Sequence, residues 1–89
     1  FIFNFDTMTF SANGKRIEFS KTEQKLLRLL TENRGTTLPR DTLIDRIWLD
    51  GAEFVESNAL SVTVRRLREK LPDAPIKTVY GIGYVWKKS

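Results

Sequence analysis

Residues 57–71 of this 89-residue chain read SNALSVTVRRLREKL, and this stretch decides the fold. At 3.6 residues per turn, Leu60, Val64, Leu67 and Leu71 fall within one narrow stripe. Such a stripe predicts a helix over about 57–71 that packs one face against a hydrophobic core. The prolines at positions 72 and 75 end this helix.

The side of the helix opposite the apolar stripe is polar and mostly basic. It presents Asn58, Val62, Arg65, Arg66 and Glu69, with Thr63 and Lys70 on one edge and Ser61 and Arg68 on the other. Arginine can donate two hydrogen bonds to guanine, asparagine can do the same with adenine, and an aliphatic group can contact the thymine methyl. The pattern favours a helix that reads DNA bases. The alternative is an ordinary solvated face with an Arg65–Glu69 ion pair.

The charge distribution agrees with this interpretation. The net charge is +4, and residues 61–89 hold seven basic and only two acidic side chains. An excess of positive charge confined to one third of a chain favours a surface that faces a polyanion, most often nucleic acid. A solubilising surface is the alternative.

The segments before this helix predict strands and then two further helices. Residues 1–19 alternate apolar and polar side chains around Asn13-Gly14, a strong hairpin signal, which predicts antiparallel strands. Ser20 and Glu23 form a capping-box pattern before a leucine-rich helix that Gly35 can end. Residues 36–38 resemble a short extended link, and Pro39 suits the first turn of a second helix that reaches Trp48.

After the basic helix, residues 76–87 are rich in β-branched and aromatic side chains, split by Gly81-Ile82-Gly83. This pattern predicts a two-stranded hairpin with a tight tip. Lys77, Tyr80, Tyr84 and Lys87 give the hairpin aromatic and cationic groups that suit phosphates or a DNA groove. The alternative is that Tyr84 and Trp86 are core aromatics, and for Trp86 we favour the core. The whole chain therefore reads as one α+β domain: strands, three helices and a terminal ribbon.

Composition excludes several other classes of protein. The chain has no Cys and no His, so it lacks a thiolate nucleophile, the usual general base and the commonest metal ligands. No apolar run approaches the roughly 20 residues that span a bilayer. We expect no catalytic residue, metal site or cofactor, and no contact with a membrane. Since the chain opens on Phe1-Ile2-Phe3 without an initiator Met, we expect it to be a piece of a longer protein.

Two motifs resemble the DNA-binding domain of OmpR/PhoB-type response regulators. They are residues 62–71, VTVRRLREKL, and residues 76–84, IKTVYGIGY, supported by SKTE at 20–23 and LIDRIW at 43–48. The resemblance covers essentially residues 1–89 and implies a winged helix-turn-helix with an additional four-stranded N-terminal sheet. In this family the third helix is the recognition helix in the major groove, and the terminal hairpin is a wing near the minor groove.

The resemblance also implies roles for individual residues. Arg66 matches the principal base reader, and the side chains of Val62 and Asn58 suit base edges, although Asn58 also stands at a phosphate-contacting position of the family. Phosphate contacts are implied for Arg40, Trp48, Thr63, Arg65, Arg68, Thr78 and Tyr84. The wing comprises Lys77, Tyr80, Gly81, Ile82 and Gly83. The loop 49–57, with Asp50, Glu53, Phe54 and Glu56, matches the segment that engages RNA polymerase.

The sequence differs from the family pattern at several positions. Tyr80 stands where the family often has Arg, Asn58 and Thr63 where Arg and His are frequent, and Glu69 where a basic residue is usual.

The implied function is sequence-specific binding to double-stranded DNA in a bacterial cytoplasm. Partners implied by the resemblance are a direct-repeat operator bound as a tandem dimer, RNA polymerase, and an N-terminal receiver domain that phosphorylation controls. Two alternatives stay open: the same domain in a membrane-anchored regulator, and a winged helix whose Arg65, Arg66 and Arg68 bind an acidic protein.

Overall fold

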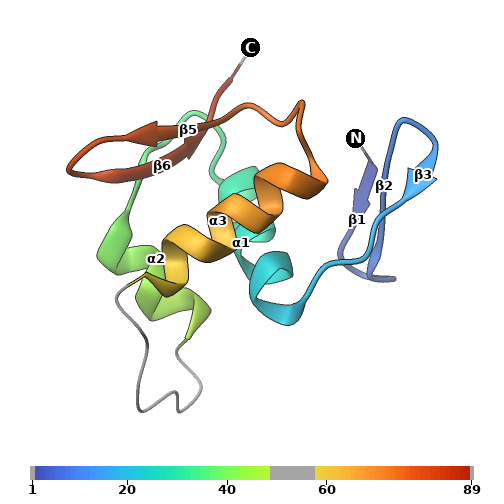
Figure 1. Cartoon of the computed structure of the whole chain (residues 1–89), viewed down its shortest axis with the longest axis horizontal. Helices are drawn as coiled ribbons and strands as arrows, with labels where there is room; N and C mark the ends of the chain where they lie inside the picture. The colour runs from blue at the N-terminus through green and yellow to red at the C-terminus, as the bar shows by residue number, and fades with distance from the viewer. Residues whose placement is uncertain (1, 49–57, 89) are drawn as a thin grey trace.

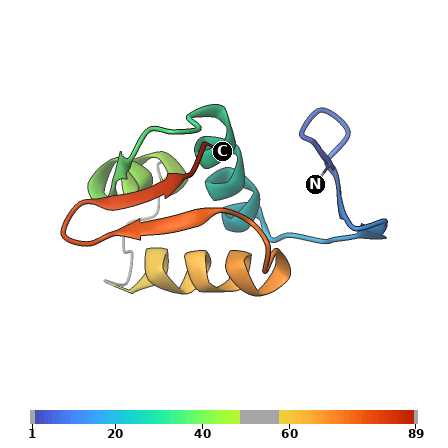
Figure 2. The same cartoon turned by 90° about the horizontal axis from the view of Figure 1, so that it is seen from above.

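A computed structural model describes residues 2–48 and 58–88 of the chain. Its elements are β1 (Ile2–Asn4), β2 (Thr9–Ala12), β3 (Lys15–Arg16), α1 (Lys21–Glu32), β4 (Leu38–Pro39), α2 (Arg40–Ile47), α3 (Ala59–Lys70), β5 (Ile76–Val79) and β6 (Gly83–Trp86). The strands form two antiparallel sheets: β1, β2 and β3 form one, and β4, β5 and β6 form the other. The hairpin β5–β6 runs alongside α3, and its tip lies at the opposite end of the molecule from the N-terminal sheet (Figures 1 and 2).

The N-terminal sheet has the strand order β1-β2-β3. Its predicted hairpin is confirmed, because Ala12 pairs with Lys15 and both Asn13 and Gly14 have a positive φ, of 53° and 77°. Residues 2–48 contribute three strands to this sheet, so the expectation of four is not met in the part of the chain that the structure describes. Phe10 is buried on β2 and stacks edge-on against Phe19, which joins the sheet to the core.

Helix α1 begins with the predicted capping box. The Glu23 N–H donates to the Ser20 hydroxyl at 3.3 Å, and the Ser20 N–H donates to the Glu23 carboxylate at 3.1 Å. The helix ends at Glu32 rather than at Gly35. Asn33 leaves the helical conformation, and its side-chain Nδ2 donates back to the Leu29 carbonyl at 2.8 Å. Gly35, with φ of 82°, lies in the turn that follows.

The hydrophobic core lies between the three helices and the C-terminal sheet. It contains Leu26, Leu27 and Leu30 of α1, Leu43 and Ile47 of α2, Leu60, Val64 and Leu67 of α3, Leu71, Ile76, Tyr84 and Trp86. Trp86 is buried, as the sequence predicts. No helix within residues 2–48 and 58–88 is long and apolar enough to cross a membrane.

The C-terminal sheet has three strands, in the order β4-β6-β5, where the sequence predicts a two-stranded ribbon. The third strand is the link before α2: Leu38 pairs with Tyr84, and Pro39 pairs with Gly83. Pro39 therefore precedes α2 as an edge-strand residue instead of opening the helix, and an edge position suits a residue that has no N–H. This strand attaches the hairpin to the start of α2.

Glu23 and Lys70 tie α3 to the beginning of α1. Lys70 donates to the Glu23 carboxylate and, at 2.9 Å, to the Glu18 carbonyl. Burial alone raises the pKa of Glu23, but the hydrogen bonds and charge of Lys70, together with the bonds from Ser20, lower it more. The pKa of Glu23 therefore lies below the ordinary glutamate value, and the buried carboxylate is charged at neutral pH.

We expect the free energy of unfolding to fall as the pH drops through this lowered pKa. A carboxylate whose folded-state pKa lies below its unfolded-state value stabilises the fold above the unfolded-state pKa, and this stabilisation is lost as the pH falls through the folded-state value. At about pH 7, Glu23→Gln should cost about 1.5–3 kcal/mol, because it removes a charge-assisted hydrogen bond. Urea unfolding between about pH 7 and pH 3 measures both effects.

The matched control is Glu32→Gln, which removes the exposed i,i+4 partner of Arg28. This change should cost less than about 0.5 kcal/mol. The prediction fails if the wild type and Glu23→Gln lose stability in parallel as the pH is lowered.

Candidate nucleic-acid interface

The orientation of α3 decides which of its side chains face solvent. Leu60, Val64 and Leu67 are at most 1% exposed, which confirms the predicted apolar stripe. Ser61, Arg65, Arg66 and Glu69 are exposed and Val62 is half-buried, so these residues make up the outward face of α3.

Arg66 is the cation of the outward face that is free to meet a ligand. Within the part of the chain that the structure describes, its guanidinium has no hydrogen-bond or ion-pair partner. Arg65 instead forms an ion pair with Glu69, with 3.6 Å between its Nε and the carboxylate. Both of these side chains are about two-thirds exposed, so water screens the pair and a phosphate can compete for Arg65.

The basic side chains at the two edges of α3 are bound to the protein itself. Lys70, on one edge, reaches Glu23 and Glu18 as described above. Arg68, on the other edge, donates through Nη2 to the Thr78 hydroxyl at 2.9 Å and to the Ile76 carbonyl at 3.1 Å.

The structure corrects the expected exposure of Thr63. This residue is 6% exposed, and its hydroxyl donates to the Ala59 carbonyl at 2.8 Å, one turn earlier in α3. The side chain therefore belongs to the core side of the helix, and its hydroxyl proton is already used. Asn58 precedes α3 and is exposed, and its side chain makes no capping hydrogen bond.

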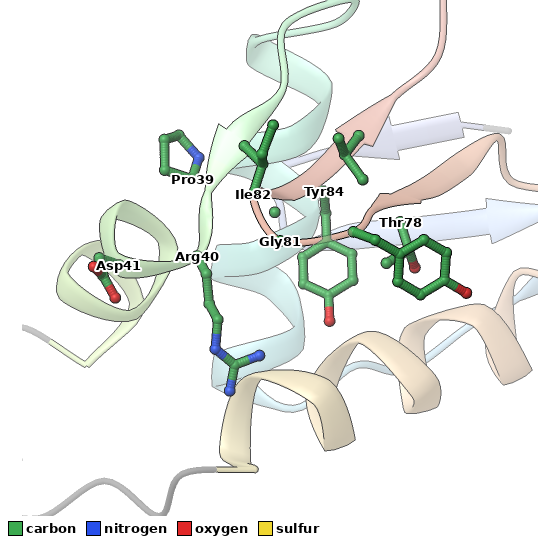
Figure 3. A pocket seen from close by; sticks show the side chains of 10 residues that line it. Pro39, Arg40, Asp41, Thr78, Gly81, Ile82 and Tyr84 are labelled. Atoms are coloured by element: carbon green, nitrogen blue, oxygen red, sulfur yellow. The ribbon is translucent and has the colours of Figure 1, made fainter.

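Two predicted phosphate contacts lie on or beside α2. Arg40 opens the helix, and its Nη1 donates to the Ser61 hydroxyl at 3.4 Å, so the side chain extends toward the first turn of α3 (Figure 3). Trp48 follows the end of α2 and is half-buried against the core. Ser61 was not among the predicted site residues, although its place on the first turn of α3 could have suggested it.

The tip of the wing is a tight turn with exposed apolar side chains. The Ile82 N–H donates to the Val79 carbonyl at 3.0 Å, and Gly81 provides the positive φ, 77°, that this turn requires. Tyr80 is 91% exposed and Ile82 is 54% exposed. Residues 78–86 carry no charged side chain, so the nearest cation of the hairpin in sequence is the exposed Lys77 on β5. Tyr84, by contrast, is 8% exposed, which is more buried than its predicted contact with phosphate requires.

Gly83 holds the wing against the segment before α2. A Cβ at this position would overlap the Leu38 carbonyl oxygen, so only glycine allows β4 and β6 to approach this closely. The Arg40 N–H donates to the Ile82 carbonyl at 2.9 Å, which fixes the tip beside the start of α2. A cleft of about 660 Å³ lies there, between residues 39–41 and 78–84 (Figure 3).

Two further observations concern the composition of the site. The predicted polymerase-contacting residues Asp50, Glu53, Phe54 and Glu56 lie outside the described residues. Within residues 2–48 and 58–88, no group of three or more acidic side chains is placed to hold a metal ion.

A family model described as the C-terminal part of transcriptional regulatory proteins matches residues 14–86. The chain belongs to this family. Its membership confirms the resemblance to OmpR/PhoB-type domains, and the two sheets, three helices and terminal hairpin confirm the winged-helix fold.

Curated relatives with a high identity are response regulators. ArlR of Staphylococcus haemolyticus is 42% identical over 84 residues, which are 90% of this chain and 38% of that protein. ArlR of Staphylococcus aureus (strain Mu50) is 42% identical over 79 residues, 84% of this chain and 36% of that protein. The chain therefore spans less than two fifths of the length of these relatives.

Two solved structures have the same fold. The DNA-binding domain of Bacillus subtilis CssR has a TM-score of 0.81 and 28% identity, over 94% of this chain and 96% of that chain. The DNA-binding domain of Klebsiella pneumoniae RstA, solved in complex with the RstA box, has a TM-score of 0.79 and 25% identity, over 96% of this chain and 88% of that chain.

We expect Gly83→Ala to destabilise this winged-helix domain by about 1–3 kcal/mol, the usual cost of overpacking, because the new methyl group overlaps the backbone of β4. Gly81→Ala is the matched control, since its Cβ meets open space and only its positive φ opposes the change, at about 1 kcal/mol. Chemical unfolding measures both costs. Hydrogen exchange of the Arg40 amide measures how well the wing tip stays attached to the start of α2, because this amide donates to the Ile82 carbonyl. Equal stability of the two variants would contradict the role assigned to Gly83.

Proposed function

We propose that this domain binds specific sequences of double-stranded DNA and is the output domain of a phosphorylation-controlled response regulator. In this proposal α3 enters the major groove and the wing, residues 76–87, lies near the minor groove. The observation that carries the proposal is the outward face of α3, on which Arg66 is exposed and has no hydrogen-bond or ion-pair partner among the described residues, whereas its neighbour Arg65 is paired with Glu69. The response-regulator relatives and the RstA complex with its DNA box support it.

Arg66 is the proposed base reader. Its guanidinium can donate two parallel hydrogen bonds to guanine O6 and N7, the pattern that distinguishes guanine in the major groove. Val62, one turn earlier on the outward face, can contact a thymine methyl, and Asn58 can bond an adenine edge.

The proposed phosphate contacts are Arg40, Trp48, Arg65, Arg68 and Thr78. They lie on α2, on α3 and on the wing, so they can hold the backbone on both sides of the groove and set the register of α3. Thr63 is left out because its hydroxyl is buried and already donates to Ala59. Tyr84 is left out as a direct contact because its side chain is buried.

The wing tip is proposed to contact DNA without an ion pair. Tyr80 occupies the position where the resemblance implies a cation, and its neighbours 78–86 are uncharged. Exposed aromatic and aliphatic side chains can pack against the apolar sugar edges of a minor groove, and apolar wedges are common among proteins that bind there. Affinity gained in this way does not depend on the release of counterions.

Further partners belong to the same proposal. The longer protein would carry the receiver domain, and two copies would bind a direct repeat in tandem in a bacterial cytoplasm. The segment 49–57, which lies outside the described residues, is the proposed contact with RNA polymerase.

Arg66→Ala should weaken binding to the selected site by about 1–3 kcal/mol and relax the preference at one base position. The measurement is site selection from a random duplex library, followed by titration of the selected duplex. Arg65→Ala is the control, because it removes an equal charge from a neighbouring position of the same face: it should weaken all sequences alike and reduce the salt slope by about one. An equal loss on specific and random DNA for Arg66→Ala would make Arg66 a phosphate contact, and the absence of any enriched site for the wild type would overturn the proposal.

Tyr80→Ala should weaken binding while leaving the salt slope unchanged, because the tip contributes contact area and no charge. Tyr80→Arg should increase the salt slope by about one, since it adds a cation beside the backbone. Titrations of the selected duplex at several salt concentrations distinguish the two variants. Wild-type affinity for both variants would show that the tip does not touch DNA.

A further inference from the structure

Arg68 connects the recognition helix to the wing through three contacts. One nitrogen of its guanidinium, Nη2, donates to the Thr78 hydroxyl at 2.9 Å and to the Ile76 carbonyl at 3.1 Å. The centre of the guanidinium lies 5.9 Å from the centre of the Tyr84 ring, within the range of a cation–π interaction. A single side chain of α3 therefore contacts both strands of the hairpin.

The three contacted residues occupy related positions in the sheet. Thr78 of β5 and Tyr84 of β6 are direct cross-strand partners, so their side chains share one face of the hairpin. Ile76 belongs to β5, which is an edge strand in the order β4-β6-β5. Edge strands leave backbone groups unpaired, and Arg68 satisfies one of these, the Ile76 carbonyl.

We propose that Arg68 is a positioning residue: with Ile76, Thr78 and Tyr84 it forms a clamp, here called the Arg68 clamp, that sets the angle between α3 and the wing. This inference rests on the proposed DNA-binding function and adds to it a device that keeps the contacts of helix and wing in register. The resemblance implies that Arg68, Thr78 and Tyr84 are three separate phosphate contacts, whereas in the structure they engage one another.

The geometry of the clamp requires arginine and not merely a positive charge. A planar guanidinium can bond two acceptors while its face lies over an aromatic ring, whereas the ammonium of lysine is a flexible point charge. Since Nη2 supplies both hydrogen bonds that Arg68 makes among the described residues, Nε and Nη1 keep their protons for an outside acceptor. Arg68 can thus carry charge toward a phosphate and position the wing at the same time, and a change to lysine separates the two roles.

The first measurement is a distance in the free protein. Because the chain has no native Cys, spin labels on Glu69→Cys in α3 and Ile82→Cys at the wing tip report the angle between helix and wing without interference. Double electron–electron resonance should give a narrow distribution of label-to-label distances in the otherwise unchanged domain. With Arg68→Lys the distribution should be shifted or broader. Arg65→Lys is the matched control on the same helix, because the partner of Arg65 in the native domain is Glu69, which the label replaces, and not a residue of the wing; it should leave the distribution unchanged.

The second measurement is a double-mutant cycle on the selected duplex. Arg68→Lys should lower affinity about tenfold, the equivalent of one or two lost hydrogen bonds to a charged group, while keeping the salt slope of the wild type. In the Arg68→Lys background, Tyr80→Ala should cost much less affinity than it does alone, because a displaced wing no longer places its tip on the DNA.

Thr78→Val tests the clamp from the side of the wing. It keeps the charge of Arg68 and removes one acceptor, so it should shift the label distance in the same direction as Arg68→Lys, and by less.

These results separate the clamp from the function on which it rests. Unchanged label distances for both Arg68→Lys and Thr78→Val, in variants that melt like the wild type, would overturn the clamp. Strictly additive costs in the cycle would also overturn it and leave Arg68 as a phosphate contact. Failure of the wild type to select any DNA site would overturn the proposed function alone, since the label distances do not require DNA.

Discussion

The burial of one stripe of α3 is the constraint on which the rest of the structure depends. With Leu60, Val64 and Leu67 packed in the core, the positions of Arg65 and Arg66 on the outward face follow from helical geometry alone. Hydrogen bonds at the two edges of the helix fix its orientation. Lys70 donates to Glu23 of α1, and Arg68 donates to Thr78 of the wing. Two of the four basic side chains of α3, Arg68 and Lys70, therefore maintain its orientation, and the other two, Arg65 and Arg66, face outward.

Local signals in the sequence were sufficient wherever structure depends on neighbouring residues. The capping box at Ser20 and Glu23 and the turn at Asn13-Gly14 formed as predicted, because each requires only residues within one turn of the chain. The apolar stripe of α3 was equally clear, since a period of 3.6 residues needs no knowledge of its partner. These signals were enough to identify the face of α3 that the structure exposes, and the DNA contacts assigned to that face stay predictions.

The features that were missed depend on contacts between distant segments. Pairing of Leu38 with Tyr84 turns the link before α2 into a strand, and residues 36–38 alone carry no signal of it. Thr63 lies at the margin of the apolar stripe, where a helical projection does not show how far the neighbouring elements extend. The contacts of Arg68 with Ile76 and Thr78 likewise required the hairpin to be placed beside α3, and neither the helical projection nor the family resemblance indicated them. The phosphate contact that the resemblance implies for Arg68 stays a prediction.

The close approach of Gly83 to Leu38 has an entropic consequence for recognition. An isolated two-stranded hairpin is at best marginally stable in water, so a wing without a third strand would have to be ordered by its ligand. Ordering at an interface costs about 0.5–1.5 kcal/mol for each immobilised side chain. Because β4 pairs with β6 along Gly83 and the Arg40 amide holds the tip, the backbone of the wing is ordered during folding. Only the exposed side chains of the tip, such as Tyr80 and Ile82, are left to lose freedom when a ligand binds.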